Sequence, residues 1–389
     1  MASRTNPVLG PRALNRATLA RQLLLRRSGM SARDAVAHLV GLQAQNVKPP
    51  YFQLHARLDG FRPEQLSGLM ESRQVVRMVT MRSTIHTHTA EDAVALRALV
   101  QPARDREVAY FRKGLVGVDL DRLAVIAREL VGERPRTMAE IRAALAVHWP
   151  EADPQALSVA ARCRLPLVQV TPRGLWGRSG QVRLAPLEQW LGEATVATEG
   201  REEGAVGVVG AVEGVEGVEG VVLRYLNAFG PASVKDMQTW AGITRLKEVF
   251  ERLRPRLVSF RDEAGTELFD LPGAPRPDED TPAPPRFLPE FDNLLLSHAD
   301  RTRVVPAGHK GRMWKGNQAY CTLLVDGFLA GLWRLDEEPA GDGRAELTVE
   351  LFERAGRGRA EEIVAEGEAL LAGMTGAGRT AVRFGTVAR

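Results

Sequence analysis

Apolar residues recur at helical spacing near the beginning of the chain. Between residues 31 and 45 they form one face, made of Ala35, Val36, Leu39, Val40 and Leu42, which indicates an amphipathic helix. Ser31 is a suitable N-cap for this helix. The Asn-Val-Lys-Pro-Pro sequence at residues 46–50 cannot continue it, so the helix should end near Gln45. The pattern thus places two glutamines, Gln43 and Gln45, at the exit of a helix.

The same order of elements recurs three times in the first 271 residues. Each copy has three helical segments, followed by two short segments rich in alternating β-branched residues. This order is typical of a winged helix, a unit that commonly faces DNA. Helices are expected at residues 12–27, 31–45 and 50–58, then at 121–131, 137–146 and 153–164, and finally at 220–229, 233–241 and 244–253. The strand pairs are expected at residues 75–81 and 84–89, 167–171 and 181–185, and 257–262 and 267–271.

Two segments interrupt this pattern. Val-Glu-Gly repeats fill residues 199–219, and proline and acidic residues dominate residues 272–285, which favours linkers at both places. The rest of the chain mixes strands with one helix, and Asp326 and Gly327 indicate a hairpin turn. We therefore predict an α+β fold with three tandem winged-helix units at residues 1–100, 101–198 and 220–271, and a C-terminal mixed α/β region at 286–389 with a protruding basic β-hairpin.

Composition favours a cytoplasmic globular protein. The 389 residues are 44% hydrophobic and include two cysteines, Cys163 and Cys321, which suits a reducing compartment. Neither a signal peptide nor a run of membrane-spanning length is evident, so no membrane association is expected. Three internal copies of one unit remove the usual need for a dimer, so a monomer is expected.

Charge is distributed unevenly along the chain. The first 60 residues hold nine basic residues against two acidic ones, whereas residues 333–368 hold eleven acidic residues against five basic ones. This distribution suggests that a polyanion is held on one face of the molecule. A genome that favours arginine codons would explain the excess of arginine equally well.

Basic side chains also mark the first predicted strand pair. Arg82 lies at its turn, and His86 and His88 share one face of the second strand. Two imidazoles could ligate zinc, but no third ligand is close in sequence, so neither a metal nor another cofactor is expected. We interpret the histidines as wing residues that face DNA or are satisfied within the protein. Arg82 is interpreted as a phosphate contact or a solvated turn residue.

A second basic segment, residues 303–314, lies between apolar strands of the C-terminal region. Arg303, His309, Lys310 and Arg312 could enter the minor groove from a narrow β-hairpin and contact phosphates. An ordinary solvated turn would have a similar sequence.

Glu290 and Asp292 offer paired carboxylates beside an apolar strand. Such pairs can act as acid and base in sugar hydrolysis, and alternation would put both on one strand face. Structural hydrogen bonding at a junction between domains is the preferred interpretation. The sequence contains no P-loop, GxSxG or HExxH motif, which leaves nucleotide hydrolysis, serine-esterase chemistry and zincin chemistry unsupported.

Several ordered segments resemble one known family. These are the Gln-Ala-Gln motif followed by Pro-Pro-Tyr, the segments at residues 81–92 and 286–305, and Val-Asp-Gly-Phe-Leu-Ala-Gly-Leu-Trp at residues 325–333. Together they resemble the AlkZ/YcaQ family of bacterial winged-helix DNA glycosylases. The resemblance implies that Gln43 and Gln45 are the catalytic pair, and that a hairpin probes DNA beside them. Two glutamines resemble the AlkZ branch, linked to azinomycin B self-resistance and interstrand-crosslink unhooking, more than the YcaQ branch, which has aspartate at the second position.

The chemistry of an amide pair fits the activity that this resemblance implies. An amide can hold a water molecule but cannot take up its proton. A purine alkylated at a ring nitrogen is cationic and leaves as a neutral base, so the enzyme has only to place a water and complement the oxocarbenium-like transition state. We therefore expect a monofunctional DNA glycosylase acting on double-stranded DNA with alkylated or crosslinked purines. A winged-helix transcription regulator is the alternative function, and a structural scaffold is a third.

Overall fold

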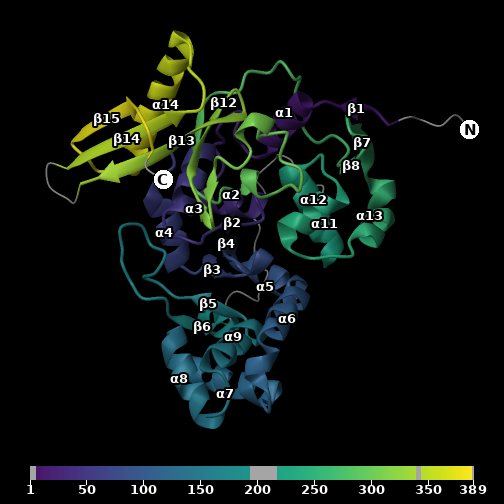
Figure 1. Cartoon of the computed structure of the whole chain (residues 1–389), viewed down its shortest axis with the longest axis vertical. Coiled ribbons are helices and arrows are strands. Elements are labelled where there is room, and N and C mark those ends of the chain that lie inside the picture. Colours follow the sequence, from purple (N-terminus) through teal and green to yellow (C-terminus); the bar gives the residue numbers. More distant parts are fainter. Residues whose placement is uncertain (1–5, 193–216, 339–342, 388–389) are drawn as a thin grey trace, which may run out of the picture.

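The computed structural model describes residues 6–192, 217–338 and 343–387. It is an α+β structure with three helical groups, each beside short strands, and a C-terminal sheet of longer strands at one side (Figure 1). The predicted linker at residues 199–219 lies almost entirely outside the described residues. No helix in the described ranges is both long and apolar enough to span a membrane.

The first group contains α1 (Pro11–Arg21), α2 (Ala32–His38), α3 (Pro49–Arg57), α4 (Pro63–Glu71), β3 (Val75–Val79) and β4 (Ile85–Thr89). Ser31 is the N-cap of α2, as predicted, because its side chain accepts a hydrogen bond from the Asp34 N–H. The predicted end of this helix near Gln45 is wrong. Val40 and Gly41 adopt positive φ angles of 55° and 94°, which turn the chain out of the helix. Leu42 and Gln43 then form a short strand, β2 (Leu42–Gln43), which pairs with β4.

The second group follows α5 (Ala90–Leu99) and α6 (Gln101–Tyr110). It contains α7 (Leu120–Glu133), α8 (Met138–His148), α9 (Pro154–Arg164), β5 (Leu167–Gln169) and β6 (Leu184–Pro186), and ends with α10 (Leu187–Leu191). Thr137 caps α8 in a reciprocal arrangement with Glu140. Strand β5 pairs with β3 of the first group, giving one sheet in the order β2-β4-β3-β5-β6. The strands of the first two groups therefore form a single sheet.

The third group contains α11 (Val218–Phe229), α12 (Val234–Ala241), α13 (Lys247–Leu253), β7 (Val258–Asp262) and β8 (Glu267–Asp270). Ser233 caps α12 as predicted, but Thr244 does not cap the next helix, which begins three residues later at Lys247. Strand β1 (Val8–Leu9), from the start of the described chain, pairs in parallel with β7. The N-terminal segment is thereby attached to the third group.

The C-terminal sheet has the order β15-β14-β13-β12-β9. Its strands are β9 (Arg286–Leu288), β12 (Cys321–Val325), β13 (Phe328–Glu337), β14 (Arg344–Leu351) and β15 (Arg379–Phe384), and α14 (Arg357–Met374) packs on it. The predicted turn between β12 and β13 is confirmed, with positive φ at both Asp326 and Gly327. Apolar residues of α14, including Leu370, share one core with Tyr51 of α3. The sheet is thus fixed against the first group.

The proline-rich segment at residues 272–285 contains no helix or strand but is held against α1. Arg16 Nε donates to the Thr281 carbonyl oxygen at 2.6 Å, and Arg21 Nη2 donates to the Pro275 carbonyl oxygen at 3.2 Å.

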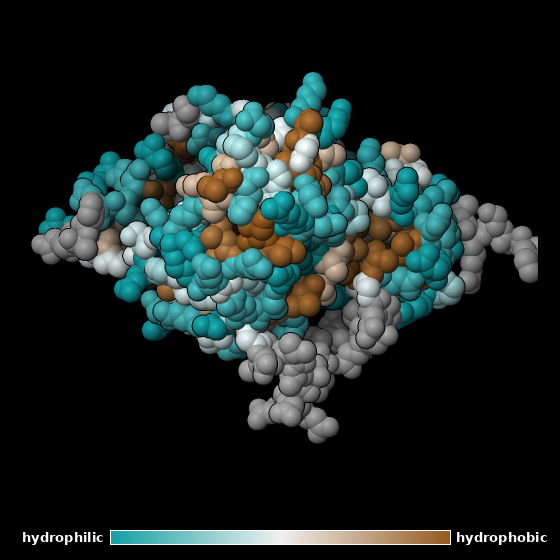
Figure 2. Space-filling model, turned by 90° about the horizontal axis from the view of Figure 1, so that it is seen from below, coloured by the Kyte–Doolittle hydropathy of each residue, from teal (hydrophilic) through white to brown (hydrophobic). Residues whose placement is uncertain are grey.

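At the end of the molecule that carries α7 and α8, apolar side chains form patches among hydrophilic ones (Figure 2).

Candidate active site

Gln43 is a buried residue held on three sides. Its side chain is 3% exposed, and Oε1 accepts a hydrogen bond from Arg82 Nη2 at 2.7 Å. Its backbone N–H donates to Asn293 Oδ1 at 3.4 Å, and its carbonyl oxygen accepts from Gln53 Nε2 at 3.0 Å. Arg82 lies in the turn between β3 and β4, Asn293 in the C-terminal region and Gln53 in α3. The position of Gln43 therefore depends on three separate parts of the chain.

Gln45 differs from Gln43 in being exposed to solvent. Between them, Ala44 is buried, and its N–H donates to the Ile85 carbonyl oxygen at 2.8 Å. Arg77 Nη2 donates to the Ala44 carbonyl oxygen at 2.9 Å. The backbone between the two glutamines is thus fixed. One amide is held inside the protein, and the other is exposed to solvent.

His86 and His88 are inside the protein, which favours the second of the two interpretations from the sequence, that they are residues of the protein interior, over contact with DNA. They are 1% and 0% exposed, and their rings stack with centroids 5.5 Å apart. Burial lowers the pKa of His86 well below its usual range and that of His88 to about 4, so both are neutral at pH 7. His88 Nε2 is 2.9 Å from Thr80 Oγ1. Within the described residues, no group of three or more His, Cys, Asp or Glu side chains is placed to hold a metal.

Arg82 occupies the predicted turn between β3 and β4, but its guanidinium points into the protein. It donates to Gln43 Oε1 and to the Trp240 carbonyl oxygen, and Nη2 lies 3.3 Å from His86 Nε2. Burial lowers its pKa to about 10, so it remains protonated at pH 7. These contacts argue against the predicted phosphate contact.

Glu290 and Asp292 are separated rather than paired. Strand β9 ends at Leu288, and Phe291 has a φ angle of 60°, so the expected alternation does not apply. Asp292 forms a fully buried, two-pronged ion pair with Arg57, with N–O distances of 2.7 and 2.8 Å. Glu290 is half-buried, and its carboxylate accepts from Asn46 Nδ2 at 3.0 Å and from Cys321 Sγ at 3.2 Å. These contacts support the structural interpretation of both carboxylates.

The predicted basic hairpin is displaced along the sequence. Arg303 is 5% exposed and donates to the Pro231 carbonyl oxygen at 2.7 Å, so its placement on an exposed tip is wrong. His309 is half-buried in a short 3₁₀ turn, with Nδ1 2.8 Å from the Leu329 carbonyl oxygen. Arg312 lies over the Phe352 ring at 3.8 Å. Of the four residues, Lys310 alone is exposed rather than buried or half-buried.

A short hairpin does follow, formed by β10 (Trp314–Lys315) and β11 (Gln318–Ala319). Its turn residues and Lys315 are exposed. The Trp314 ring contacts the ring of Phe291, with centroids 5.7 Å apart. Phe291 adjoins Glu290, which is bonded to Asn46 next to the glutamines. The hairpin is therefore anchored on the segment that supports the candidate site.

Several arginines that produce the basic excess of the first 60 residues are buried. Arg16, Arg21 and Arg57 are among the largest fully buried side chains, and each pairs with an aspartate, respectively Asp326, Asp270 and Asp292. Their charge is neutralised within the fold. The surface of the first group is accordingly less basic than its sequence indicates.

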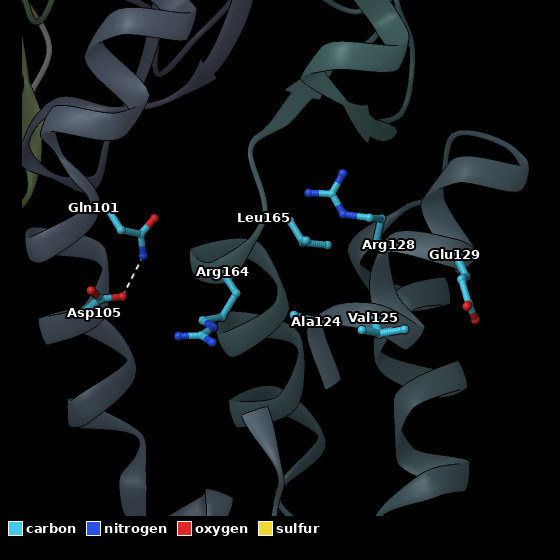
Figure 3. Close-up of a pocket in the computed structure, with 8 residues that line it drawn as sticks. All are labelled: Gln101, Asp105, Ala124, Val125, Arg128, Glu129, Arg164 and Leu165. Carbon is cyan, nitrogen blue, oxygen red and sulfur yellow. Dashed lines mark hydrogen bonds between the residues drawn. The ribbon is translucent and has the colours of Figure 1, made fainter. Parts of the chain in front are cut away.

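A surface pocket lies apart from the glutamines, between α6, α7 and the end of α9 (Figure 3). Gln101 and Asp105 are hydrogen bonded on one side of it. Arg128 and Arg164, which also line it, form ion pairs with Glu188 and Asp121. No site residue predicted from the sequence lines this pocket.

Comparison with known proteins identifies the family. Residues 36–372 match the family described as DNA glycosylase AlkZ-like. The chain belongs to the AlkZ-like DNA glycosylase family. The structure is similar to that of Streptomyces sahachiroi DNA glycosylase AlkZ, with a TM-score of 0.76 and 19% sequence identity, covering 97% of this chain and 100% of that one. A search of curated proteins gives no match.

The AlkZ-like segment contains both glutamines and the groups that hold Gln43. Sequence reasoning missed Gln53, Trp240 and Asn293 as partners of this site. Asn293 belongs to a segment that was noted for its carboxylates, and its two amide atoms hold both the Gly41 carbonyl oxygen and the Gln43 N–H. Trp240 contributes a backbone carbonyl, a group that no side-chain pattern reveals.

Proposed function

We propose that this protein is a monofunctional DNA glycosylase that hydrolyses the N-glycosidic bond of cationic alkylated purines in double-stranded DNA, including purines in interstrand crosslinks. The observation that carries the proposal is the pairing of a fixed, buried Gln43 amide with an exposed Gln45 amide, in a chain of the AlkZ-like DNA glycosylase family. Repair of alkylation damage, or self-resistance to an alkylating agent, would be its role.

The amide pair suits a reaction whose leaving group already carries positive charge. Loss of a neutral base leaves an oxocarbenium-like sugar, which a correctly placed water can attack without a strong base. Gln43 can offer this water its N–H₂ group or the second lone pair of Oε1. Gln45, whose side chain is solvent exposed, can accept a hydrogen bond from the same water. An unmodified purine lacks the built-in charge and should be a poor substrate.

The fold suits DNA held against the glutamines. We interpret the three helical groups as winged-helix units, because each places helices before a two-stranded pair. A base tethered to the opposite strand cannot swing freely out of the duplex. An enzyme for such lesions must bring its residues to the sugar along a groove. The exposed Gln45 and the neighbouring β10–β11 hairpin are consistent with that approach, and a single chain supplies all the proposed parts.

The decisive assay measures release of free base from methylated double-stranded DNA. We expect the protein to release methylated purine and to leave abasic sites, whereas unmodified DNA of the same sequence remains intact. The variant with both Gln43→Ala and Gln45→Ala serves as the control for contaminating glycosylases. Sequence-specific binding without base release would instead support a transcription regulator.

The exposed lysines near the hairpin are proposed to contact phosphates. Replacing Lys310 and Lys315 by alanine should weaken DNA binding regardless of sequence and flatten its salt dependence, by about one unit of slope for each phosphate that is no longer neutralised. Because both side chains are exposed, the melting temperature should not change. Binding is measured by fluorescence anisotropy at several salt concentrations, with Lys113→Ala as an exposed-lysine control. An unchanged slope in the double variant would assign these lysines to an ordinary solvated surface.

A further inference from the structure

The turn between β3 and β4 has an unusual backbone. Arg82 and Ser83 both have positive φ angles, 53° and 57°, in a region that residues with a side chain seldom occupy. Neither residue is glycine or asparagine, so the sequence does not favour this conformation. Strain of this kind persists only where surrounding contacts impose it, and it is concentrated at functional sites.

The contacts that impose this turn come from the third helical group. The Trp240 carbonyl oxygen, at the end of α12, accepts a hydrogen bond from Arg82 Nη1. Gly242, the C-cap of α12, lies directly against the Arg82 backbone. A Cβ atom at Gly242 would be 2.9 Å from Arg82 N and 3.0 Å from its Cα, closer than such contacts ordinarily come. The end of α12 therefore fits closely onto the turn.

The guanidinium of Arg82 determines which way the Gln43 amide faces. A guanidinium has donors only, so the Gln43 atom 2.7 Å from Arg82 Nη2 must be the amide oxygen. The Nε2 group of Gln43 then points away from Arg82. His86 completes the arrangement, because its Nδ1 lies 3.0 Å from the Thr84 carbonyl oxygen and is thus the protonated nitrogen. Its Nε2 is left as an acceptor, 3.3 Å from Arg82 Nη2.

Arg82 is also a half-buried cation whose side-chain partners are neutral. Among the described residues, its side chain bonds to an amide, a carbonyl and a neutral imidazole, and it forms no salt bridge with a carboxylate. Removing even part of such a charge from water is costly. A purely structural contact would be met at lower cost by an uncharged residue.

We infer that Arg82 is a positioning residue that fixes the orientation of the Gln43 amide, and that the end of α12 holds Arg82 in place through the Trp240 carbonyl and Gly242. This inference rests on the proposed glycosylase function. The third helical group supplies no proposed catalytic side chain, but through Arg82 it would influence the orientation of the Gln43 amide. It also replaces the phosphate contact expected from the sequence.

The test compares Arg82→Ala and Arg82→Lys with Arg73→Ala on methylated DNA. Arg73 is a matched control because it too has a positive φ, of 62°, and donates to a tryptophan carbonyl, that of Trp190, at 2.8 Å. It does not contact Gln43. Arg82→Ala should reduce the single-turnover excision rate about tenfold to a hundredfold, as removal of a supporting partner often does, while DNA affinity stays within about twofold. Arg73→Ala should keep the wild-type rate.

Arg82→Lys keeps the charge but replaces two separated guanidinium nitrogens, Nη1 on Trp240 and Nη2 on Gln43, by one ammonium nitrogen, so it cannot reproduce the planar fork. It should therefore give an intermediate rate, and it serves as the informative variant if Arg82→Ala does not fold. In a Gln43→Ala background, Arg82→Ala should cause little further loss of rate, because the group it positions is already gone.

Three outcomes would overturn the inference. The first is weaker binding and a flatter salt slope for Arg82→Ala with an unchanged rate at saturating DNA, which would make Arg82 a phosphate contact. The second is a full multiplicative loss in the Gln43→Ala background. The third is a wild-type excision rate in both Arg82 variants together with a reduced excision rate in Gln43→Ala. This outcome would exclude the positioning role of Arg82 but leave the proposed function intact. A wild-type protein that releases no base overturns the proposed function, and the inference with it.

Discussion

Replacing Gln43 or Gln45 by alanine is expected to slow single-turnover excision by about a hundredfold to a thousandfold, the usual loss when one oriented polar contact to a transition state is removed. Both amides are proposed to hold the same water, so the double variant should lose less than the product of the single losses. The rate is measured with enzyme in excess over DNA that carries one methylated purine.

Stability distinguishes the two single variants. Gln43 is buried and accepts from the half-buried Arg82, so Gln43→Ala removes one hydrogen bond and should lower the free energy of unfolding by about 0.5 to 1.5 kcal/mol. Gln45 is exposed, and Gln45→Ala should leave stability unchanged. DNA affinity should be nearly preserved in both. A double variant that excises at the wild-type rate would exclude a catalytic role for the pair.

The largest loss of stability is expected from breaking the ion pair between Arg57 and Asp292. Both side chains are 0% exposed, and Arg57 also donates to the Gln53 carbonyl oxygen and to Gln22 Oε1. Asp292→Ala leaves an uncompensated buried guanidinium, so unfolding should become easier by about 3 to 5 kcal/mol. Urea unfolding followed by circular dichroism measures this loss.

An exposed pair provides the control for this experiment. Arg33 and Glu91 form an ion pair at 2.6 Å with side chains 36% and 58% exposed, and Glu91→Ala should cost less than about 1 kcal/mol. The double change Arg57→Met with Asp292→Leu should be less harmful than Asp292→Ala, because no buried charge remains. A loss below about 1 kcal/mol for Asp292→Ala would show that the ion pair does not stabilise the segment of Asp292 and Asn293 that contacts Gln43.

Local signals in the sequence predicted much of the secondary structure. The caps at Ser31, Thr137 and Ser233 are confirmed, because an N-cap depends on a side chain and an amide only three residues apart. The two paired strands β3 and β4 are likewise confirmed, although both of their faces are buried rather than alternately buried and exposed. These features depend on neighbours in the sequence, which a single chain displays directly.

The environment of the candidate site could not be predicted in the same way. Gln43 lies on a strand because Val40 and Gly41 turn the chain and β4 offers a partner, and β4 comes about forty residues later. Arg57 contributes to the basic excess of the first 60 residues, but its partner, Asp292, lies 235 residues away, so the sequence does not reveal that the charge is neutralised. The resemblance to a family picked out the glutamines. Only the three-dimensional structure shows that one of them is enclosed and the other is exposed.

The groups around Gln43 are widely spaced along the chain, and this spacing determines when the candidate site can assemble during synthesis. Gln43 leaves the ribosome early, whereas Trp240 and Asn293, which brace its turn and its strand, are synthesised much later. A nascent or prematurely ended chain that stops before residue 240 carries both glutamines but lacks these braces. Only a chain that extends past residue 293 can assemble the arrangement, so shorter products would hold the motif without the geometry proposed for base excision.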